Sequence, residues 1–399
     1  MVPSGWICSQ IGDIANIQVG RDLVEDRYSD NQTEQYKYPV YSNTIENRGL
    51  YGFYDFPEYP GNAVTVVGRG IGLGTAFARY ENEAFGAIGR LLVLTPKNNY
   101  FDVGYFADYI NFLLRIHNES GGIPQLPGSS LSKYSVILPP LSEQKKNAQI
   151  LSTWDQAIST TEQLLANSQQ QKKALMQQLL TSKKRLRDKN GVRFSGEWSR
   201  SGLGNVFDKI SNGVTYDAKN MDGLPVTRIE TISTGKINYE KVGWAPDEDN
   251  TRRFKLKKGD ILYSHINSLE HIGRVAYFNG SKELYHGMNL LLLRAKNNYD
   301  SLFLFYVLNS QIGKKYAKTF AKSAVNQASI STADIKAFKV HIPCFDEQQK
   351  IGLVLSVADQ DIETLQRKLD CLKQEKKALM QQLLTGKRRV NIEQKELHN

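Results

Sequence analysis

A ten-residue segment occurs twice in this chain of 399 residues, and this repetition constrains the fold more than any other feature. The segment KKALMQQLLT spans residues 172–181 and returns unchanged at 376–385, 204 residues later. The match continues at the same offset, for example from Asp155-Gln156 to Asp359-Gln360. Repeat arrays have periods of about 20–50 residues, so this longer period indicates an internal duplication with two large copies.

Both copies of this segment lie in stretches whose apolar residues follow a helical spacing. From Leu355 to Leu383 the steps alternate between three and four residues, which is the pattern of a coiled-coil seam. The first copy follows the same steps, but Ser168 and Lys172 interrupt it, and neither stretch contains proline. A helix with such a seam must bury it, so we predict two long helices that pack together, with two core helices of separate globular domains as the alternative. The residues predicted to pack in the seam or against a partner are Leu151, Trp154, Ile158, Leu165, Leu175, Leu179, Leu355, Ile362, Leu365, Leu369, Leu372, Leu379 and Leu383.

The predicted elements follow the same order in the two blocks that precede these helices. Each block has short aromatic and β-branched runs interrupted by glycine and proline, as in β-hairpins, then a helix, a loop and a strand that ends at a proline. The sequence therefore predicts an α+β fold, with two similar domains of mixed sheet and helices separated by long helices in a pseudo-twofold internal repeat. The predicted boundaries are 1–140 and 188–343 for the domains, 141–187 and 344–390 for the helical regions, and 391–399 for a polar tail.

Composition narrows the range of environments and partners. The formal net charge is +10, which favours a polyanionic partner but does not by itself identify one. The three cysteines, Cys8, Cys344 and Cys371, match neither a disulfide framework nor a metal-site spacing, as expected in a reducing cytosol. No run of about 18 apolar residues and no secretory signal is present, so we expect a cytoplasmic protein without a membrane partner.

The sequence contains no catalytic motif that we recognise, so we predict that the chain is not an enzyme. The glycine-rich run 68–75 lacks the lysine of a phosphate-binding loop, and a tight connection between strands explains it better. The spacing of His265, His271 and His286 matches no zinc signature, and we expect no metal or cofactor in this chain. A catalytic Asn/Asp-Pro-Pro-Tyr/Phe tetrapeptide and a glycine-rich S-adenosylmethionine loop are also missing.

The candidate binding surface consists of polar and basic side chains on or beside the turns of the two blocks. Arg, Asn and Gln can pair with base edges, whereas Lys, Ser and Thr bind phosphates, so this set suits DNA. The alternative for any single member is a solvated loop residue or a turn cap. The basic runs 183–187 and 387–389 end the two helices, where the helix dipole alone accounts for them. The candidates are Arg21, Tyr41, Ser42, Asn43, Arg48, Arg69, Gln125, Ser129, Ser130 and Lys133 in the first block, and Tyr216, Lys219, Arg228, Ser264, His265, Asn267, Lys322, Ser323, Asn326 and Gln327 in the second.

Several further motifs accompany the two KKALMQQLLT segments. They are PPLSEQ at 139–144, IPCFDEQ at 342–348, Trp6 and Trp198 with the glycines after them, and GDIL at 259–262 followed by IGRV at 272–275. Taken together, these motifs resemble the specificity subunit of a type I restriction–modification enzyme. The resemblance covers nearly the whole chain, and the doubled pattern is specific. One departure is Cys344-Phe345-Asp346, which replaces the usual Pro-Leu-x before Glu347 at the entry to the second helix.

The resemblance implies a non-catalytic subunit that binds double-stranded DNA through two target-recognition domains, each reading one half of a split site. Two helices, packed antiparallel as a coiled coil, would set the gap between the halves. Two methyltransferase subunits would bind S-adenosylmethionine and methylate adenine at N6, and two restriction subunits would use ATP and Mg. The main alternative is a coiled-coil scaffold with two β-rich modules that bind protein. A nuclease or methyltransferase acting alone would need a catalytic motif that the sequence does not provide.

Overall fold

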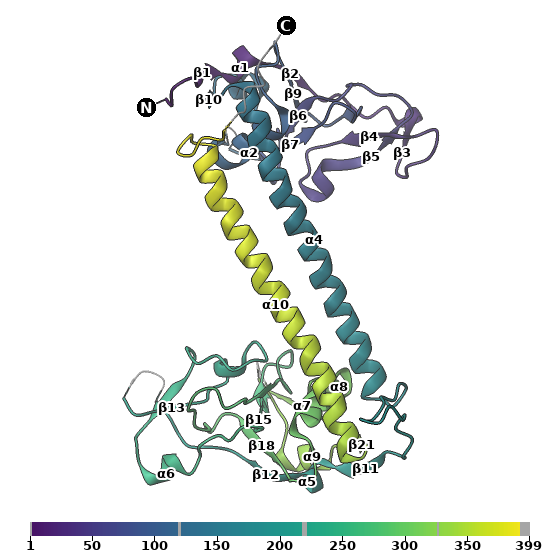
Figure 1. The fold of residues 1–399 in the computed structure, drawn as a ribbon, viewed down its shortest axis with the longest axis vertical. Helices are drawn as coiled ribbons and strands as arrows, with labels where there is room; N and C mark the ends of the chain where they lie inside the picture. Colours follow the sequence, from purple (N-terminus) through teal and green to yellow (C-terminus); the bar gives the residue numbers. More distant parts are fainter. Residues whose placement is uncertain (1, 119–120, 218–221, 325–326, 392–399) are drawn as a thin grey trace. The chain divides into compact units, whose positions relative to one another are not determined.

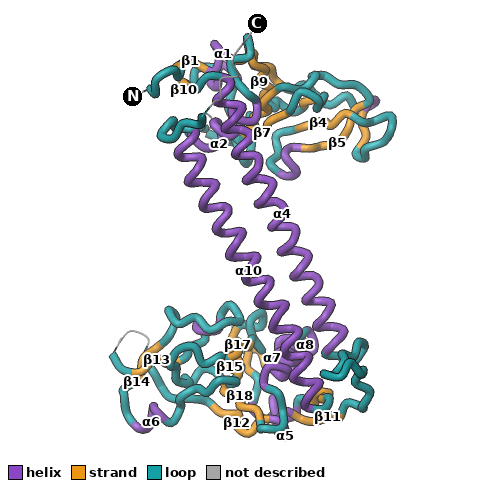
Figure 2. The backbone as a smooth tube through the Cα atoms, viewed as in Figure 1, coloured by secondary structure: helices purple, strands orange, loops and turns teal. Residues whose placement is uncertain are grey.

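The computed structural model describes residues 2–118, 121–217, 222–324 and 327–391. The chain divides into two compact units, one made of Met1–Glu162 and Arg367–Asn399 and the other of Gln163–Gln366. We call them unit 1 and unit 2. Each unit contains one β-rich block together with half of each of the two long helices, and Figure 2 shows the strands gathered in the blocks. The described helices include none that is long and apolar enough to cross a membrane.

Unit 1 is built on an antiparallel four-stranded sheet that α2 covers. The sheet order is β2 (Ala15–Val19), β9 (Leu92–Pro96), β6 (Ala63–Val66) and β7 (Ala76–Arg79), and α2 is Val103–Leu113. A second sheet has the order β3 (Tyr28–Ser29), β5 (Leu50–Tyr54), β4 (Tyr38–Tyr41) and β8 (Gly86–Ala87). The remaining elements are β1 (Ile7–Gln10) paired with β10 (Ser135–Leu138), α1 (Ile11–Ile14), α3 (Gly128–Leu131), and the 3₁₀ turns η1 (Glu25–Arg27) and η2 (Glu46–Gly49).

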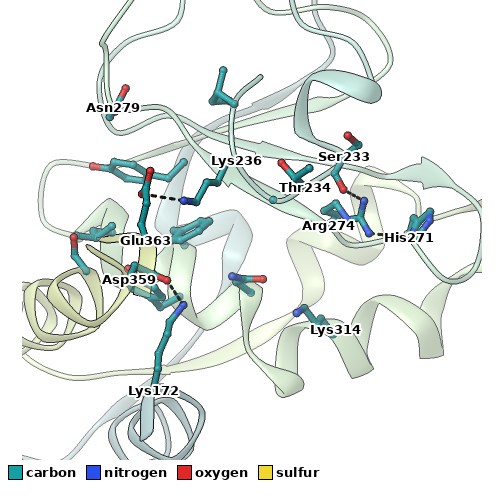
Figure 3. A pocket seen from close by; sticks show the side chains of 18 of the residues that line it. Lys172, Ser233, Thr234, Lys236, His271, Arg274, Asn279, Lys314, Asp359 and Glu363 are labelled. Atoms are coloured by element: carbon teal, nitrogen blue, oxygen red, sulfur yellow. Dashed lines mark hydrogen bonds and ion pairs between the residues drawn. The ribbon is translucent and has the colours of Figure 1, made fainter. Parts of the chain in front are cut away.

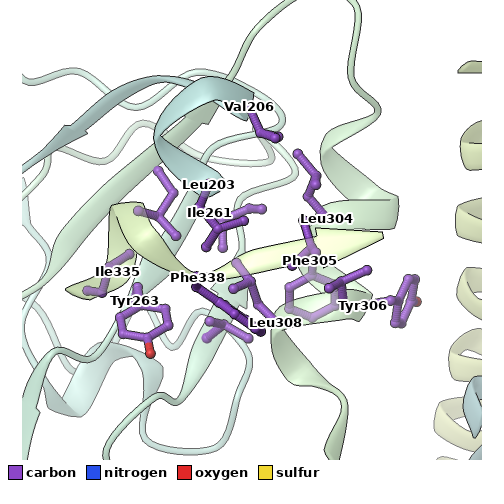
Figure 4. Close-up of a cluster of buried hydrophobic side chains, with 14 of the residues drawn as sticks. Leu203, Val206, Ile261, Tyr263, Leu304, Phe305, Tyr306, Leu308, Ile335 and Phe338 are labelled. Carbon is purple, nitrogen blue, oxygen red and sulfur yellow. The ribbon is translucent and has the colours of Figure 1, made fainter. Parts of the chain in front are cut away.

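Unit 2 repeats this framework and adds a helix to it. Its main sheet has the order β12 (Phe207–Ser211), β18 (Leu291–Ala295), β15 (Ile261–Tyr263) and β17 (Val275–Tyr277), with α7 (Ser301–Asn309) and α8 (Gln311–Phe320) after it. Figure 4 shows α7 side chains packed with residues of this sheet and with Ile335 and Phe338 in one buried cluster. The remaining elements are β11 (Ser199–Gly202) paired with β21 (Lys339–Ile342), β13 (Leu224–Val226) paired with β14 (Gly243–Ala245), a sheet of β16 (Ile266–Asn267), β20 (Gln327–Ser329) and β19 (Lys322–Ala324), α5 (Leu203–Val206), α6 (Asp249–Arg252), α9 (Thr332–Ala337) and η3 (Glu230–Ile232).

Equivalent hydrogen bonds tie each block to the start of its long helix. The helices are α4 (Leu141–Leu179) and α10 (Phe345–Leu383), each 39 residues long (Figure 1). The side-chain carbonyl of Gln144 accepts a hydrogen bond from the backbone N–H of Asp102 at 3.0 Å, and Gln348 accepts one from Asp300 at 2.9 Å. Asp102 and Asp300 in turn cap the N-termini of α2 and α7. The glutamine that both copies carry at this position therefore joins each block to its long helix.

The thirteen residues predicted to pack along the helix seam are all buried or half-buried in the structure. Six of them are almost completely buried, and these six form three pairs at the offset of 204 residues. The pairs are Leu151 with Leu355, Leu165 with Leu369, and Leu179 with Leu383. The two copies of the repeat therefore bury the same helix positions. Because the steps of three and four residues keep these positions on one face of each helix, the buried face follows directly from the sequence pattern.

Ion pairs within each unit show that the halves of α4 and α10 run in opposite directions. In unit 1, Lys376 pairs with Asp155 at 2.5 Å and Lys373 pairs with Glu162 at 2.7 Å, so one sequence number falls as the other rises. In unit 2, Lys172 pairs with Asp359, which is the same pair at the offset of 204 residues. The lysine that interrupts the predicted seam is therefore an ion-pairing position, and such polar pairs fix the register of packed helices.

A second repeated contact lies at the C-terminal end of each long helix. Arg185 binds the buried carboxylate of Glu347 through two nitrogens, at 2.6 and 2.7 Å, and Arg389 binds Glu143 in the same way at 2.7 Å. Each guanidinium also lies near a tryptophan ring, at 5.8 Å from the centroid of Trp198 and 5.9 Å from that of Trp6. Arginines from both basic runs therefore serve as structural clamps within their own units.

The two units differ at one position that faces a lysine–aspartate pair. Asp108 and Tyr306 both lie six residues after the capping aspartate of their helix. Tyr306 donates a hydrogen bond to Asp359 at 2.7 Å, whereas Asp108 is a carboxylate near Lys376 and Asp155. Burial raises the pKa of Asp108 to about 6, with repulsion from Asp155 and Asp102 adding to the effect and Lys376 opposing it. Unit 1 therefore carries an unfavourable charge at neutral pH where unit 2 has a phenol.

We expect Asp108→Asn to stabilise unit 1 at pH 8 by about 1–3 kcal/mol, because one pKa unit corresponds to about 1.4 kcal/mol. The cost of the carboxylate is fully present above the raised pKa of about 6 and disappears below the ordinary pKa near 4, so only a small part of the gain should remain at pH 4. Thermal unfolding at both pH values measures this difference. The exposed Asp22→Asn is the matched control and should change stability by less than about 0.5 kcal/mol. An equal gain from Asp108→Asn at pH 4 and pH 8 would contradict this account.

Candidate nucleic-acid interface

In each unit, an equivalent strand of the main sheet leads into a candidate binding surface; this strand is β6 in unit 1 and β15 in unit 2. In unit 1, β6 continues into the glycine-rich run 68–75, which connects it to the antiparallel strand β7, as the sequence predicts. Leu126 donates a backbone hydrogen bond to Gly68 at 2.9 Å, and Arg69 forms a β-bridge with Gln125. Two predicted residues that are 56 positions apart in the chain are therefore neighbours.

Unit 2 places its equivalent segment in the same way. The strand β15 leads into residues 264–274, and Ile330 donates a backbone hydrogen bond to His265 at 2.9 Å. The β16–β20–β19 sheet then brings Asn267 opposite Ala328, and Ala328 opposite Ser323. We call the two regions the connection surfaces: residues 68–75 with 121–126 in unit 1, and residues 264–274 with 322–324 and 327–330 in unit 2. They share a backbone framework but carry different side chains.

Five more predicted residues of unit 1 lie on, or directly beside, loops that join its connection surface. Asn43 links two of these loops, because its side-chain carbonyl accepts from the backbone N–H of Gly68 at 2.8 Å and its side-chain amide donates to the carbonyl of Gly89. Gly89 also donates to the carbonyl of Arg21 at 2.9 Å, which places that arginine beside the same loop. The other three, on one segment with Asn43, are Tyr41, Ser42 and Arg48.

Arg79 supports this group, although the sequence did not single it out. Its guanidinium is buried, lies 3.3 Å from the centroid of the Tyr41 ring and donates to the carbonyl of Arg48 at 2.6 Å. Burial lowers the pKa of Arg79 to about 10, with the nearby cation Arg48 acting in the same direction, so it stays charged at neutral pH. Arg79 therefore holds the backbone of Arg48, whose φ of 54° lies in the left-handed region. No feature of the AFAR strand distinguishes this arginine from a surface one.

Three predicted residues of unit 1 lie apart from this loop cluster. Ser129, Ser130 and Lys133 are on or just after α3, whose first residue faces Ile17 of β2. Ser132 anchors this segment, because its carbonyl accepts from the backbone N–H of Gly12 at 2.8 Å. Ser129 and Lys133 are exposed. These residues therefore remain a separate prediction at the β2 side of the unit.

In unit 2 the predicted residues divide into buried and exposed groups. Ser264 and His265 are buried, and the side-chain amide of Asn267 donates to the Ser264 hydroxyl at 3.0 Å. Burial lowers the pKa of His265 to about 4, so its imidazole is neutral at physiological pH and suits hydrogen bonding better than charge pairing. Lys322 and Gln327 are exposed on β19 and β20. These two side chains are accessible to a ligand, whereas the buried pair supports the loop.

Of the remaining candidates of unit 2, Tyr216 and Arg228 lie outside its connection surface. The Tyr216 hydroxyl accepts from the side-chain amide of Asn289 at 2.8 Å, and Arg228 pairs with Glu230 at 2.8 Å. These contacts favour structural roles. Ser323 is in β19, whereas Lys219 and Asn326 fall outside the residues that the structure describes.

The two connection surfaces and the adjoining loops carry cations that form no ion pair within the described residues, although the exposed carboxylate of Glu270 also lies on this surface. Arg21, Arg69 and Lys322 have no carboxylate partner among the described residues, and Arg21 and Lys322 are exposed. Unpaired cations of this kind attract phosphates. The described residues also contain no group of three or more His, Cys, Asp or Glu side chains arranged to hold a metal ion. The unpaired cations make the two connection surfaces candidates for binding an anion.

Comparison with known proteins shows which proteins this chain is similar to. A sequence profile described as "Type I restriction modification DNA specificity domain" matches residues 3–168 and 195–374. The chain is 42% identical over 194 residues to the "putative type I restriction enzyme MjaX specificity subunit" of Methanocaldococcus jannaschii, which covers 47% of the chain and 46% of that protein. It is 27% identical over 315 residues to the MjaVIII specificity subunit of the same organism, covering 75% and 73%. This chain thus spans just under half of the first relative and about three quarters of the second.

A solved structure shares the fold across nearly the full chain. It is the S subunit of a type I restriction–modification system from M. genitalium, with a TM-score of 0.65, 15% identity, and coverage of 95% of this chain and 96% of that one. At this identity the likeness concerns the fold alone.

Proposed function

Because the chain belongs to the family of type I restriction–modification specificity subunits, whose DNA specificity domain it carries twice, we propose that it recognises a bipartite, asymmetric DNA target. In this proposal each connection surface reads one half-site, and α4 with α10 sets the gap between them. The observation that carries it is the repeated framework with divergent side chains, Arg69 with Gln125 in unit 1 and Asn267 with Lys322 in unit 2. Two similar frameworks with different side chains suit two different half-sites.

The proposed mode of reading follows from the chemistry of these groups. Arg21 and Lys322, both exposed, would contact phosphates and set the position of the duplex. Arg69, Gln125 and Gln327 would read base edges in the major groove, where arginine prefers guanine and glutamine prefers adenine. The polar pairs along the seam support the ruler function, because they fix the register of the two helices within each unit.

The chain itself would carry out no chemistry. Two methyltransferase subunits, docked on the helices and domains, would bind S-adenosylmethionine and methylate adenine at N6. Two restriction subunits would supply ATP- and Mg-dependent cleavage. The alternative, a coiled-coil scaffold with two β-rich protein-binding modules, has no specific observation in its favour beyond the helices themselves.

A measurement of binding to duplex DNA distinguishes DNA recognition from the scaffold function. We expect the chain, assembled with its methyltransferase partner, to bind duplex DNA with an affinity that falls steeply with salt, by about 10³–10⁵-fold between 50 and 200 mM for six to ten phosphate contacts. Fluorescence anisotropy with a labelled duplex measures this slope. Partner assembly that is unaffected by duplex DNA, with no salt-dependent binding, would favour the scaffold.

Substitutions in the two connection surfaces are expected to act on different half-sites. Arg69→Ala should weaken discrimination in one half-site by about 1–3 kcal/mol and leave the other unchanged. Gln327→Ala should do the reverse, and each variant is the matched control for the other. Selection of bound duplexes from a randomised library measures both preferences. Equal loss at both half-sites from either substitution would contradict the assignment of one half-site to each unit.

A further inference from the structure

A polar cavity of about 940 Å³ lies within unit 2, beside the Lys172–Asp359 pair and the end of the connection surface at 270–274 (Figure 3). Residues of α4, α7, α8, α10 and the segments 233–239 and 270–281 line it. Its wall carries five basic side chains and three acidic ones. The volume falls in the range of small-molecule sites, which is about 300–1,000 Å³.

Two of the three acidic groups are already engaged inside the unit. Asp359 accepts from Lys172 and from the Tyr306 hydroxyl, and Glu363 pairs with Lys236 at 2.9 Å. These pairs neutralise two of the lysines as well. The third acidic residue, Glu270, is exposed. The positive charge that remains therefore belongs to Arg274 and to the two lysines of α8.

Arg274 is held in place beside α8. Its guanidinium donates to the carbonyl of Ser233 and lies 2.9 Å from Nδ1 of His271. The preceding residue, Gly273, has a φ of 76°, and a Cβ there would collide with Ala317 of α8. The backbone at Gly273 lies so close to α8 that only glycine fits there, and Arg274, the next residue, therefore lies beside this helix.

Lys314, one turn before Ala317 on α8, is one of these cations, and its side chain as a whole is exposed. Partial burial lowers the pKa of Lys314, and the nearby charges of Arg274 and Lys172 lower it further. Within the described part of the chain its ammonium has no carboxylate partner. Figure 3 shows Arg274 and Lys314 reaching the cavity from two different elements, whereas Lys172 is paired with Asp359. Cations gathered in this way repel one another until an anion binds between them.

We propose that this cavity is a phosphate-binding site, in which Lys314, Arg274 and Lys318 hold a phosphate group. Ammonium groups act as point charges on phosphate oxygens, and a guanidinium adds directional hydrogen bonds. The phosphate comes either from a free polyphosphate, such as the chain of a nucleotide, or from the backbone of bound DNA. The second source rests on the proposed function, whereas the first does not. The described residues between α2 and α3 of unit 1 form no helix that corresponds to α8, so this part of unit 1 contains no counterpart of the site.

Titration of the full chain with sodium tripolyphosphate tests the proposal. Isothermal titration calorimetry should give binding at about one site per chain, and Lys314→Met should weaken it at least about tenfold, the effect of losing one close charge. The exposed Lys241→Met lies outside the cavity, changes the net charge equally and should leave binding unchanged. Because Lys314 faces like charges, its replacement should not lower the unfolding temperature. No binding by the unchanged chain, or equal binding by both variants, would overturn the site.

The DNA arm of the experiment distinguishes the two sources. If the site takes a backbone phosphate, tripolyphosphate competes with duplex DNA, and Lys314→Met reduces the salt slope of duplex binding by about one. If it takes a free polyphosphate, the slope is unchanged in this variant. A chain that binds tripolyphosphate through Lys314 but binds no duplex in its assembled complex would keep the phosphate site and overturn the DNA function instead.

Discussion

Replacing Arg185 with methionine is expected to lower the stability of unit 2 by about 3–5 kcal/mol, which is the typical cost of leaving a buried charge without its partner. The Glu347 carboxylate is completely buried, and both of its oxygens accept from this guanidinium. Arg185 itself is only 17% exposed, so water replaces it poorly. Hydrogen exchange of peptides from β12 and β18, followed by mass spectrometry, measures the local loss of stability in unit 2.

Two further variants separate a buried ion pair from a general effect of charge. The double variant Arg185→Met with Glu347→Leu removes the orphaned carboxylate as well and should recover most of the loss. Lys183→Met removes an exposed charge from the same basic run and should change stability by less than about 0.5 kcal/mol. A single Arg185 variant that matches Lys183→Met would show that the clamp contributes little. The equivalent Arg389→Met should cost less, because Arg389 is 43% exposed.

Lengthening both long helices by seven residues is expected to widen the DNA gap by about three base pairs without changing either half-site. The insertions belong after Glu162 and after Gln366, where the chain passes from one unit to the other at equivalent positions of the repeat. Seven helical residues add about 10.5 Å at 1.5 Å per residue. One base pair occupies about 3.4 Å, which converts this length into the expected change.

The positions of these insertions preserve the contacts inside each unit. The pairs Lys376–Asp155 and Lys373–Glu162 stay within unit 1, and Lys172–Asp359 stays within unit 2. Target motifs identified from the methylated DNA of cells that carry the variant give the gap directly. Replacing residues around both boundaries with others of equal helix propensity, without a change of length, is the control and should keep the original gap. An altered half-site sequence with an unchanged gap would contradict the ruler function.

Much of the framework could be predicted from the sequence, because it depends on local patterns that occur twice. The steps of three and four residues identified the buried face of each long helix, and the glycine-rich run 68–75 was correctly interpreted as a strand connection. The sequence predicts one helix after the strands of each block, and in unit 1 this helix is α2, which ends at Leu113. In unit 2 the corresponding stretch is divided into α7 and α8, because Ser310 leaves the helical conformation and caps α8 through its side chain.

The contacts between distant segments could not be predicted in the same way. In the sequence, Lys172 only interrupts an apolar seam. The structure shows that it pairs with Asp359, which is 187 positions away in the chain. The pairing of Arg69 with Gln125 depends on the β-bridge between two loops, and one sequence contains no signal for it. Burial also separates residues that look alike in the sequence, because Ser264 and His265 support a loop while Lys322 and Gln327 are exposed. The assignment of bases to side chains therefore remains a proposal.

The most direct test of the account is methylome sequencing of cells that carry this chain with its methyltransferase partner, compared with cells that lack this chain alone. We expect a new N6-methyladenine motif that consists of two different short half-sites around a gap of fixed length and unspecified sequence. Such a motif would identify both targets at once. An unchanged methylome, with the partner expressed and bound to this chain, would contradict the DNA-recognition function and favour the scaffold.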